Sequence, residues 1–291
     1  MASAAVRVAL DARDQLGEGP VWDAPGGRLL RVDISRGLVH AWDPVAGSTA
    51  TTAFEGDTAA VVPRARQPGW VVAVGRELLL DEPSGRTVLA GVEPDLPDNR
   101  FNDCRCDPRG RLWAGTLSKR RAAGAAALYR LEAGGPIERV VSGTTTSNGL
   151  GWSPDGETMY FVDSATQRLD VYDFDAAGGT LSNRRPLASI DPADGLPDGL
   201  AVDAEGGIWL ALFGGAALRR YTPAGDLDAH IELPVTNPTC PAFGGPDLTR
   251  LYATSARHRL SPERLAAEPL AGALLELDPG VAGLPAGRFA G

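Results

Sequence analysis

Short apolar segments, separated by turns rich in Gly, Pro and Asp, recur along the whole chain. Each unit has a polar, glycine-rich stretch, a short apolar strand, a turn, and a second strand with an aromatic residue or a leucine. The second strands of six units are marked by Leu30, Trp70, Trp113, Tyr160, Trp209 and Tyr252, which are 40 to 49 residues apart. Multi-stranded repeats of about 40 to 50 residues are typical of β-propellers. The pattern therefore predicts an all-β fold, a six-bladed β-propeller.

A third strand with β-favouring residues follows in every unit. These strands read LVHAWD (38–43), ELLLDE (77–82), ALYRLE (127–132), LDVYDF (169–174), ALRRYT (217–222) and ALLELD (273–278). The segment 5–10 is expected to pair into the last blade and close the ring, which removes exposed sheet edges. The one predicted helix is 261–270, with Ser261 as N-cap and Pro262 in the first turn.

No composition break or linker divides the chain, so we expect one domain over residues 1–291. Hydrophobic residues make up 43%, enough for a sizeable core, and the 36 glycines and 23 prolines fit many turns. A pair of β-sandwiches, the alternative, would not explain the even spacing of the repeats.

The chain is acidic, with a net charge of -9 and an isoelectric point near 4.9. Such a surface repels phosphate backbones and anionic lipid, so we expect no nucleic-acid partner and no membrane partner. No protein partner is indicated. The first 15 residues lack the uninterrupted apolar core of a secretory signal, and no apolar run approaches the ~18 residues of a membrane span. Three cysteines suit a reducing compartment, and the expected localisation is cytoplasmic.

Polar residues at one phase of the repeat indicate a site on the propeller axis. Eleven or twelve positions before the second-strand markers stand Glu18, Asn102, Asn148 and Asp198. The remaining two blades offer Thr58 or Ala59, and Cys240 or Pro241, at that phase. Each polar residue alone is an ordinary turn residue. Converging oxygens with net negative charge favour one divalent ion: Ca²⁺, Mg²⁺ or Mn²⁺, with Zn²⁺ or Fe²⁺ less favoured.

Several phrases of this sequence resemble the regucalcin/gluconolactonase family, also called the senescence marker protein family. They are LGEGPVW (16–22), NRFNDCRCDPRGRLWAGT (99–116), SNGLGWSPDGETMYFVD (147–163), DGLAVDAEGGIWLAL (198–212) and GGPDLTRLYATSAR (244–257). The stretch 255–270 is similar to bacterial sugar-lactonase members. The family fold is a six-bladed propeller, in agreement with the repeat count.

The resemblance implies one divalent metal ion on the axis, held by Glu18, Asn148 and Asp198. Arg100 and Asn102 correspond to substrate-contacting residues, and Asp103 is expected to add an outer contact. Family enzymes hydrolyse sugar lactones to aldonic acids, so the expected partner is a small sugar lactone in carbohydrate metabolism. Asp198 is then both ligand and proton acceptor, and therefore the candidate catalytic residue.

The sequence departs from some animal members after residue 117, where it reads Ser118-Lys119-Arg120-Arg121 instead of carrying acidic residues. Either these basic residues change which hydroxyl pattern or charge of a substrate the mouth of the site favours, or the arginines point to solvent. Two other functions stay open. One is hydrolysis of another lactone, ester or organophosphate on the same metal centre, and the other is a non-catalytic calcium-binding propeller.

Overall fold

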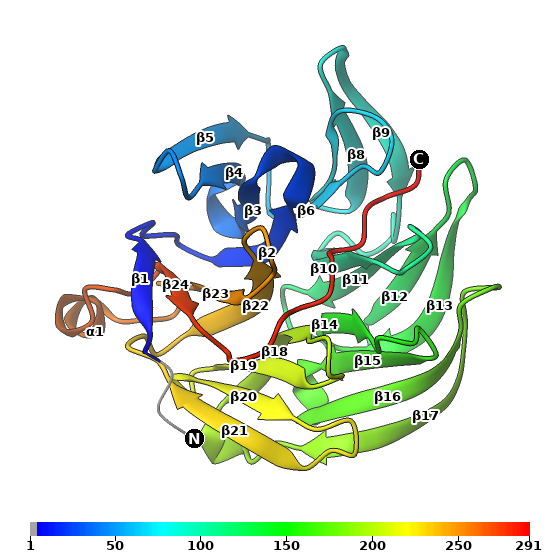
Figure 1. Cartoon of the computed structure of the whole chain (residues 1–291). Helices are drawn as coiled ribbons and strands as arrows, with labels where there is room; N and C mark the ends of the chain where they lie inside the picture. The colour runs from blue at the N-terminus through cyan, green and yellow to red at the C-terminus, as the bar shows by residue number, and fades with distance from the viewer. Residues whose placement is uncertain (1–4) are drawn as a thin grey trace.

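The computed structural model describes residues 5–291 and arranges six four-stranded antiparallel sheets around a central axis (Figure 1). Blade 1 consists of β2 (Gly17–Asp23), β3 (Arg28–Asp33), β4 (Leu38–Asp43) and β5 (Ser48–Ala53). Blade 2 consists of β6 (Thr58–Pro63), β7 (Trp70–Val74), β8 (Glu77–Glu82) and β9 (Gly85–Gly91). Blade 3 consists of β10 (Asn99–Cys106), β11 (Leu112–Ser118), β12 (Ala126–Leu131) and β13 (Ile137–Thr144). Blade 4 consists of β14 (Ser147–Trp152), β15 (Thr158–Asp163), β16 (Arg168–Asp175) and β17 (Thr180–Ser189). Blade 5 consists of β18 (Leu196–Val202), β19 (Ile208–Phe213), β20 (Ala217–Tyr221) and β21 (Leu227–Glu232). Blade 6 consists of β22 (Pro238–Gly244), β23 (Arg250–Ser255), β24 (Leu274–Leu277) and β1 (Arg7–Leu10).

The prediction of a six-bladed, all-β propeller is confirmed. The short helix α1 (Pro262–Ala267) is the one α-helix of the described residues, and the Ser261 side chain caps it by accepting from the Arg264 N–H at 3.2 Å. Four 3₁₀ turns follow or precede strands: Ala24–Gly26, Ile34–Arg36, Ser164–Thr166 and Pro192–Asp194.

The ring closes through the N-terminal strand, as expected from the sequence. Strand β1 pairs antiparallel with β24, with Val8 opposite Leu275, and Arg7 forms an ion pair of 2.6 Å with Glu276. The sixth blade therefore contains strands from both ends of the chain. This arrangement ties the first blade to the last and leaves no open gap in the ring.

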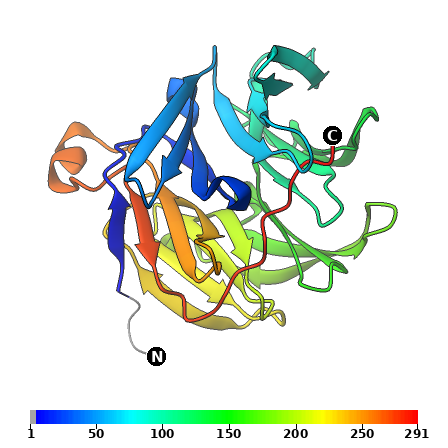
Figure 2. The ribbon, with the colours of Figure 1, turned by 45° about the horizontal axis from the view of Figure 1, so that its top comes forward.

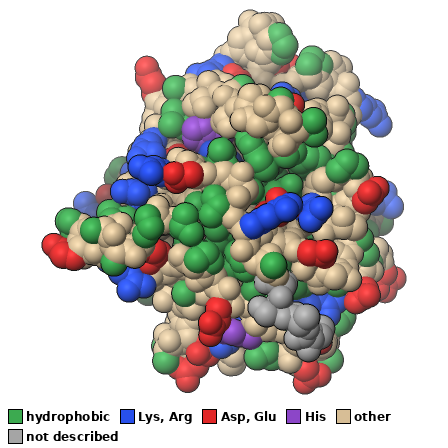
Figure 3. Space-filling model, turned by 60° about the vertical axis from the view of Figure 1, so that its left-hand side comes forward, with side chains coloured by type: hydrophobic (Ala, Val, Ile, Leu, Met, Phe, Trp, Pro, Cys, Tyr) green, Lys and Arg blue, Asp and Glu red, His purple; other side chains and the backbone are tan. Residues whose placement is uncertain are grey.

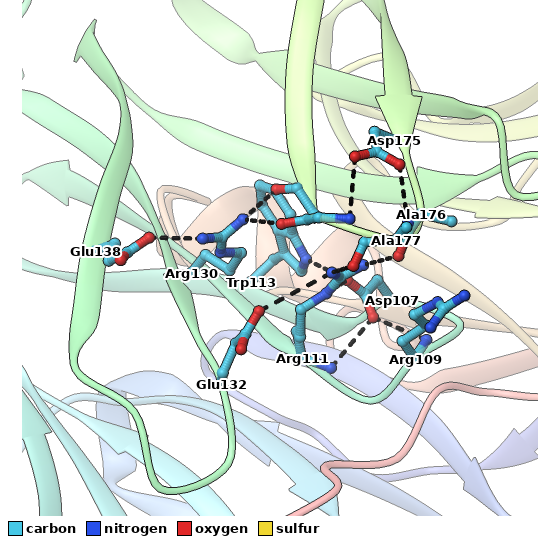
Figure 4. Close-up of polar contacts among 12 residues, drawn as sticks. Asp107, Arg109, Arg111, Trp113, Arg130, Glu132, Glu138, Asp175, Ala176 and Ala177 are labelled. Atoms are coloured by element: carbon cyan, nitrogen blue, oxygen red, sulfur yellow. Dashed lines mark hydrogen bonds and ion pairs between the residues drawn. The ribbon is translucent and has the colours of Figure 1, made fainter.

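Buried aspartates with tryptophan partners explain one repeated phrase of the sequence, DPRGRLW in blade 3 and DAEGGIW in blade 5. The Asp107 carboxylate accepts hydrogen bonds from Trp113 Nε1 at 3.0 Å and Arg111 Nε at 2.6 Å (Figure 4). Arg111 continues into blade 4, where it donates to the carbonyl of Ala176 at 2.7 Å. Asp203 makes the matching bond to Trp209 Nε1 in blade 5, at 2.9 Å. Each aspartate thus anchors the first hairpin of its blade.

Replacing Asp107 by alanine is expected to lower the free energy of unfolding by about 3–5 kcal/mol, because it removes the buried anion of the Arg111 guanidinium and leaves it the exposed Glu132 at 4.0 Å. Chemical denaturation monitored by tryptophan fluorescence measures the change. Glu138→Ala is a matched control, since Glu138 pairs with Arg130 but its side chain is 53% exposed, and it should cost less than about 1 kcal/mol. Equal losses in the two variants would contradict this role for Asp107.

The last residues of the chain cross one end of the central channel as a strap (Figure 2). Residues 284–288 and 290 line a cavity of about 660 Å³ there, together with the ends of the inner strands. The Phe289 N–H donates to the carbonyl of Pro63 at 2.9 Å, and the Ala290 N–H to that of Gly110 at 3.0 Å. This end of the channel is therefore covered by the chain's own C-terminal segment, and the polar site residues lie toward the other end.

Charged side chains of both signs surround an apolar area on the side of the molecule shown in Figure 3. Within residues 5–291, no helix has the length and apolar character needed to cross a membrane.

Candidate active site

A β-bulge interrupts the innermost strand of every blade at nearly the same level. The pairing registers shift between Glu18 and Val21, Thr58 and Ala60, Phe101 and Cys104, Ser147 and Leu150, Pro197 and Leu200, and Pro238 and Pro241. Asn102, Asn148 and Asp198 lie inside their bulges, and Glu18 stands directly before its own. A bulge bends the strand and re-aims its side chains. The ring of bulges thus accounts for the predicted ring of polar side chains.

Two glycines of the bulges allow neighbouring inner strands to approach closely. A Cβ on Gly149 would lie 2.7 Å from the backbone oxygen of Asp198, and one on Gly199 would lie 2.4 Å from Cys240 Sγ. Both contacts are too short for any larger residue without a shift of the neighbouring strand. The Asn148-Gly149 and Asp198-Gly199 pairs, which alone suggest turns, therefore lie within strands. Their glycines let Asn148 and Asp198 converge.

Five of the sequence-predicted site residues line one cavity of about 820 Å³ at the end of the channel opposite the strap: Glu18, Arg100, Asn102, Asn148 and Asp198. Asp103, the sixth, does not line it. Its carboxylate is buried next to Arg105, whose Nη1 is 3.2 Å from Asp103 Oδ1. The substrate contact predicted for Asp103 stays a prediction, with the side chain placed beside the cavity instead of in its wall.

A chain of hydrogen bonds fixes the floor of the cavity. The Asn148 amide nitrogen donates to Asp198 Oδ1 and, at 3.0 Å, to Ser164 Oγ. The Ser164 hydroxyl donates onward to the carbonyl of Pro197 at 2.7 Å. Because its amide nitrogen is used in this way, Asn148 keeps its oxygen available as an acceptor or metal ligand.

Buried negative charge dominates the electrostatics of the floor. Burial first, and the nearby Asp103 carboxylate next, raise the pKa of Glu18 to about 8. The pKa of Asp198 is also raised well above its ordinary value, first by burial and then by Glu18 and Asp103. Buried carboxylates that repel one another either hold protons, as the raised pKa values indicate, or need a cation to compensate their charge.

The residues present fit a hard divalent cation. Two carboxylates and one amide, from Glu18, Asp198 and Asn148, supply oxygen ligands of the kind that Ca²⁺, Mg²⁺ and Mn²⁺ prefer. Asp103, outside the cavity lining, has Arg105 as its ion-pair partner in the described part of the chain. Among residues 5–291, no three His, Cys, Asp or Glu side chains come together as a metal site. A site at this position thus depends on the amide oxygen of Asn148.

Arg100 stands beside the floor with its guanidinium held in place. Arg100 Nη1 donates to the carbonyl of Phe101 at 2.7 Å and to Asn102 Oδ1 at 3.0 Å, and Asn102 donates to the carbonyl of Ser147 at 3.1 Å. Burial lowers the pKa of Arg100, while Asp57, Glu18 and Asp198 oppose the shift. The remaining N–H groups of this buried cation are available to a ligand.

Cys240 lies outside the cavity lining. Its sulfur is buried against Gly199 and accepts a hydrogen bond from Arg105 Nη2 at 3.0 Å. Burial raises the pKa of its thiol well above the ordinary value. Cys240 therefore packs beneath the site. All three cysteines, Cys104, Cys106 and Cys240, are buried free thiols.

Other residues of the cavity were not predicted from the sequence. Asp57 joins Arg100 Nε at 3.7 Å and Lys119 Nζ at 3.2 Å. His258, which stands outside the repeat phase, also lines the cavity. The position of Asp57 just before the blade 2 inner strand could have indicated it, whereas the loop that carries His258 has no counterpart in the other blades.

Comparisons with known proteins agree with this architecture. The model of the SMP-30/Gluconolactonase/LRE-like region matches residues 16–257. The Bacillus subtilis (strain 168) protein YvrE, provisionally named a sugar lactone lactonase, is 34% identical over 284 residues, 97% of each chain. A structure of calcium-binding regucalcin from Agrobacterium tumefaciens superposes with a TM-score of 0.92 at 32% identity, covering 98% of this chain and 97% of that one. A luciferin-regenerating enzyme superposes with a TM-score of 0.92 at 30% identity, covering 99% of both chains.

Proposed function

Because the chain belongs to the SMP-30/gluconolactonase/LRE-like family, we propose that it is a metal-dependent hydrolase that converts a sugar lactone to the aldonic acid in sugar catabolism. The observation that carries this proposal is the floor of the cavity, where Glu18, Asn148 and Asp198 gather beside the Arg100 guanidinium. The name of the Bacillus subtilis relative supports the lactone, and the name of the Agrobacterium tumefaciens structure supports calcium as the first metal to test.

A divalent cation held by Glu18, Asn148 and Asp198 would polarise the lactone carbonyl and stabilise negative charge on its oxygen. The chain's own groups supply the rest. Asp198 takes one proton from the attacking water as the new C–O bond forms, and returns it to the ring oxygen as the ring C–O bond breaks. Arg100 donates to substrate oxygens, and Asn102 holds Arg100 in that orientation. The net reaction adds one water to the lactone.

Replacing Arg100 by alanine is expected to raise KM about tenfold or more, since a hydrogen bond from a charged group is worth about 1.5–3 kcal/mol. The effect on kcat should be smaller, because Arg100 binds the substrate in both the ground and transition states. Steady-state kinetics on one lactone separate the two constants. Arg120→Ala is the control, because within residues 5–291 the one ion-pair partner of Arg120 is the exposed Asp98, at 2.8 Å. An unchanged KM for the Arg100 variant would count against substrate contact.

A calcium-binding propeller without catalytic activity is the second candidate, because a relative of 32% identity is named for calcium binding. A panel of pentose and hexose aldonolactones, with acid release followed by a pH indicator, separates the candidates. Metal-stripped protein is assayed after Ca²⁺, Mg²⁺, Mn²⁺, Zn²⁺ or Fe²⁺ is added back. Metal-dependent hydrolysis supports the lactonase. Stoichiometric calcium binding without hydrolysis of any lactone or simple ester would favour the second candidate.

A further inference from the structure

The mouth of the cavity carries more positive charge than its walls neutralise. Four positively charged side chains line the cavity together with His258: Arg100, Lys119, Arg121 and Arg259. Its four acidic side chains are Glu18, Asp57, Asp163 and Asp198. Glu18 and Asp198 belong to the proposed metal site on the floor. The remaining two acids decide whether the basic residues at the mouth have partners.

Those two acids are already engaged. The oxygens of Asp163 accept from the backbone N–H groups of Thr145 at 3.0 Å and Thr146 at 2.9 Å. The Asp57 carboxylate is shared by Lys119 and Arg100.

Within residues 5–291, neither Arg121 nor Arg259 forms an ion pair with an acidic side chain. Arg120 is next in sequence to Arg121, but it pairs with Asp98 and does not line the cavity.

The unpaired arginines converge on one side of the mouth. Arg259 Nε lies 3.2 Å from His258 Nε2 and donates to it. The charges of Arg100 and Arg121 both act on His258, whose pKa is lowered by burial first and by these two arginines next. Arg100, Arg121 and Arg259 therefore line the cavity together with His258.

Backbone geometry holds the two outer arginines at these positions. Arg121 and Arg259 have φ of 54° and 65°, in the left-handed region that residues other than glycine seldom adopt. The Arg121 turn is closed by its N–H, which donates to the carbonyl of Ser118 at 2.7 Å. Both arginines, whose side chains are exposed, line the cavity that contains the floor residues.

We propose that the preferred substrate is a sugar lactone that carries an anionic substituent, a carboxylate or a phosphate ester, on the end of the molecule remote from the lactone carbonyl. The inference rests on the proposed function and specifies its substrate class. With the carbonyl at the floor, this substituent faces the mouth, where Arg121 and Arg259 offer planar pairs of N–H donors. A neutral aldonolactone would leave both guanidinium groups without a partner.

The test compares three lactones on metal-loaded protein: a neutral aldonolactone, an aldaric acid monolactone with a free carboxylate, and an aldonolactone phosphate ester. The measured quantity is the ratio of kcat/KM for each acidic lactone to that for the neutral one. Arg121→Gln and Arg259→Gln should each lower this ratio about tenfold for the preferred acidic lactone, since each removes a charge-assisted interaction. Arg120→Gln, the matched control, should leave the ratio at the wild-type value.

The inference is supported if the wild-type enzyme prefers the carboxylate or the phosphate lactone, and if this preference is lost in Arg121→Gln but kept in Arg120→Gln. The preferred lactone then identifies the anion. If wild type hydrolyses the neutral lactone at least as well as both acidic ones, and Arg121→Gln leaves the ratios unchanged, the inference is wrong while the proposed function stands. If metal-loaded wild type hydrolyses none of the three lactones, nor any member of the aldonolactone panel, the proposed function fails and the inference fails with it.

Discussion

Replacing Asp198 by asparagine is expected to reduce kcat for lactone hydrolysis about a thousandfold or more. The variant loses the group that accepts the proton from water, an effect of about 10²–10⁴ in rate by itself, and weakens the proposed metal site as well. The fold should be kept, because the change removes one of three buried, mutually repelling carboxylates, the others being Glu18 and Asp103. Circular dichroism and thermal melting of the metal-free variant check this, and its Tm should be no lower than that of wild type.

Asp194→Asn is the matched control for this experiment. It is the same substitution four residues earlier, at a side chain that is 40% exposed and pairs with Arg219 at 2.8 Å. We expect its kcat to stay within about twofold of wild type, since an exposed ion pair contributes little. An Asp198 variant that keeps a tenth or more of the wild-type kcat would show that another group takes the proton.

Metal-free protein is expected to become less stable as the pH rises, and added metal should reverse this trend. Glu18 has a pKa of about 8 in the folded chain against 4.5 ordinarily, so the folded state holds a proton that the unfolded chain has lost. Stability therefore falls between about pH 4.5 and pH 8, by at most about 1.4 kcal/mol per pH unit for one such proton. Metal binding requires the ionised carboxylates, so the stabilisation that metal gives should grow over the same range.

Thermal melting at pH 5, 6.5 and 8, with and without Ca²⁺ or Mn²⁺, measures both trends. Glu18→Gln supplies the comparison, because it removes the titrating group and a proposed ligand together. Its metal-free Tm should depend less on pH, and its Tm should respond less to metal. A wild-type Tm that is unaffected by metal at pH 8 would contradict the proposed site.

The propeller was predictable because each blade repeats one local pattern that burial enforces. The inner three strands of a blade pack against neighbouring blades, so their apolar residues recur at a regular spacing. The outermost strands of blades 1 to 5 were not identified. Strand β5 (STATTA) and strand β9 (GRTVLAG) are mostly exposed, so nothing selects an apolar alternation in them. In blade 2, Trp70 pairs with Pro63. Val72 instead holds the position, second beyond the bulge, that the aromatic markers hold in blades 3 to 6.

Convergence of Glu18, Asn148 and Asp198 was also predictable, since residues of equal phase on inner strands must meet near the axis. The walls of the mouth were not, because they come from loops that differ from blade to blade. Lys119, Arg120 and Arg121 are adjacent in sequence, yet Lys119 pairs with Asp57 and Arg120 pairs with Asp98, while Arg121 lines the cavity and has no acidic partner within residues 5–291. Arg121 also differs in its positive φ of 54°, which sequence patterns do not reveal.

The measurement that tests the central claim most directly is a titration of metal-stripped protein with Ca²⁺ or Mn²⁺ in which bound metal and lactonase rate are followed in the same samples. We expect the rate to rise in proportion to occupancy and to level off at one ion per chain. Glu18→Gln should bind weakly and gain little activity. Full activity of the metal-stripped wild type, or a rate that does not follow occupancy, would contradict a catalytic cation between Glu18, Asn148 and Asp198.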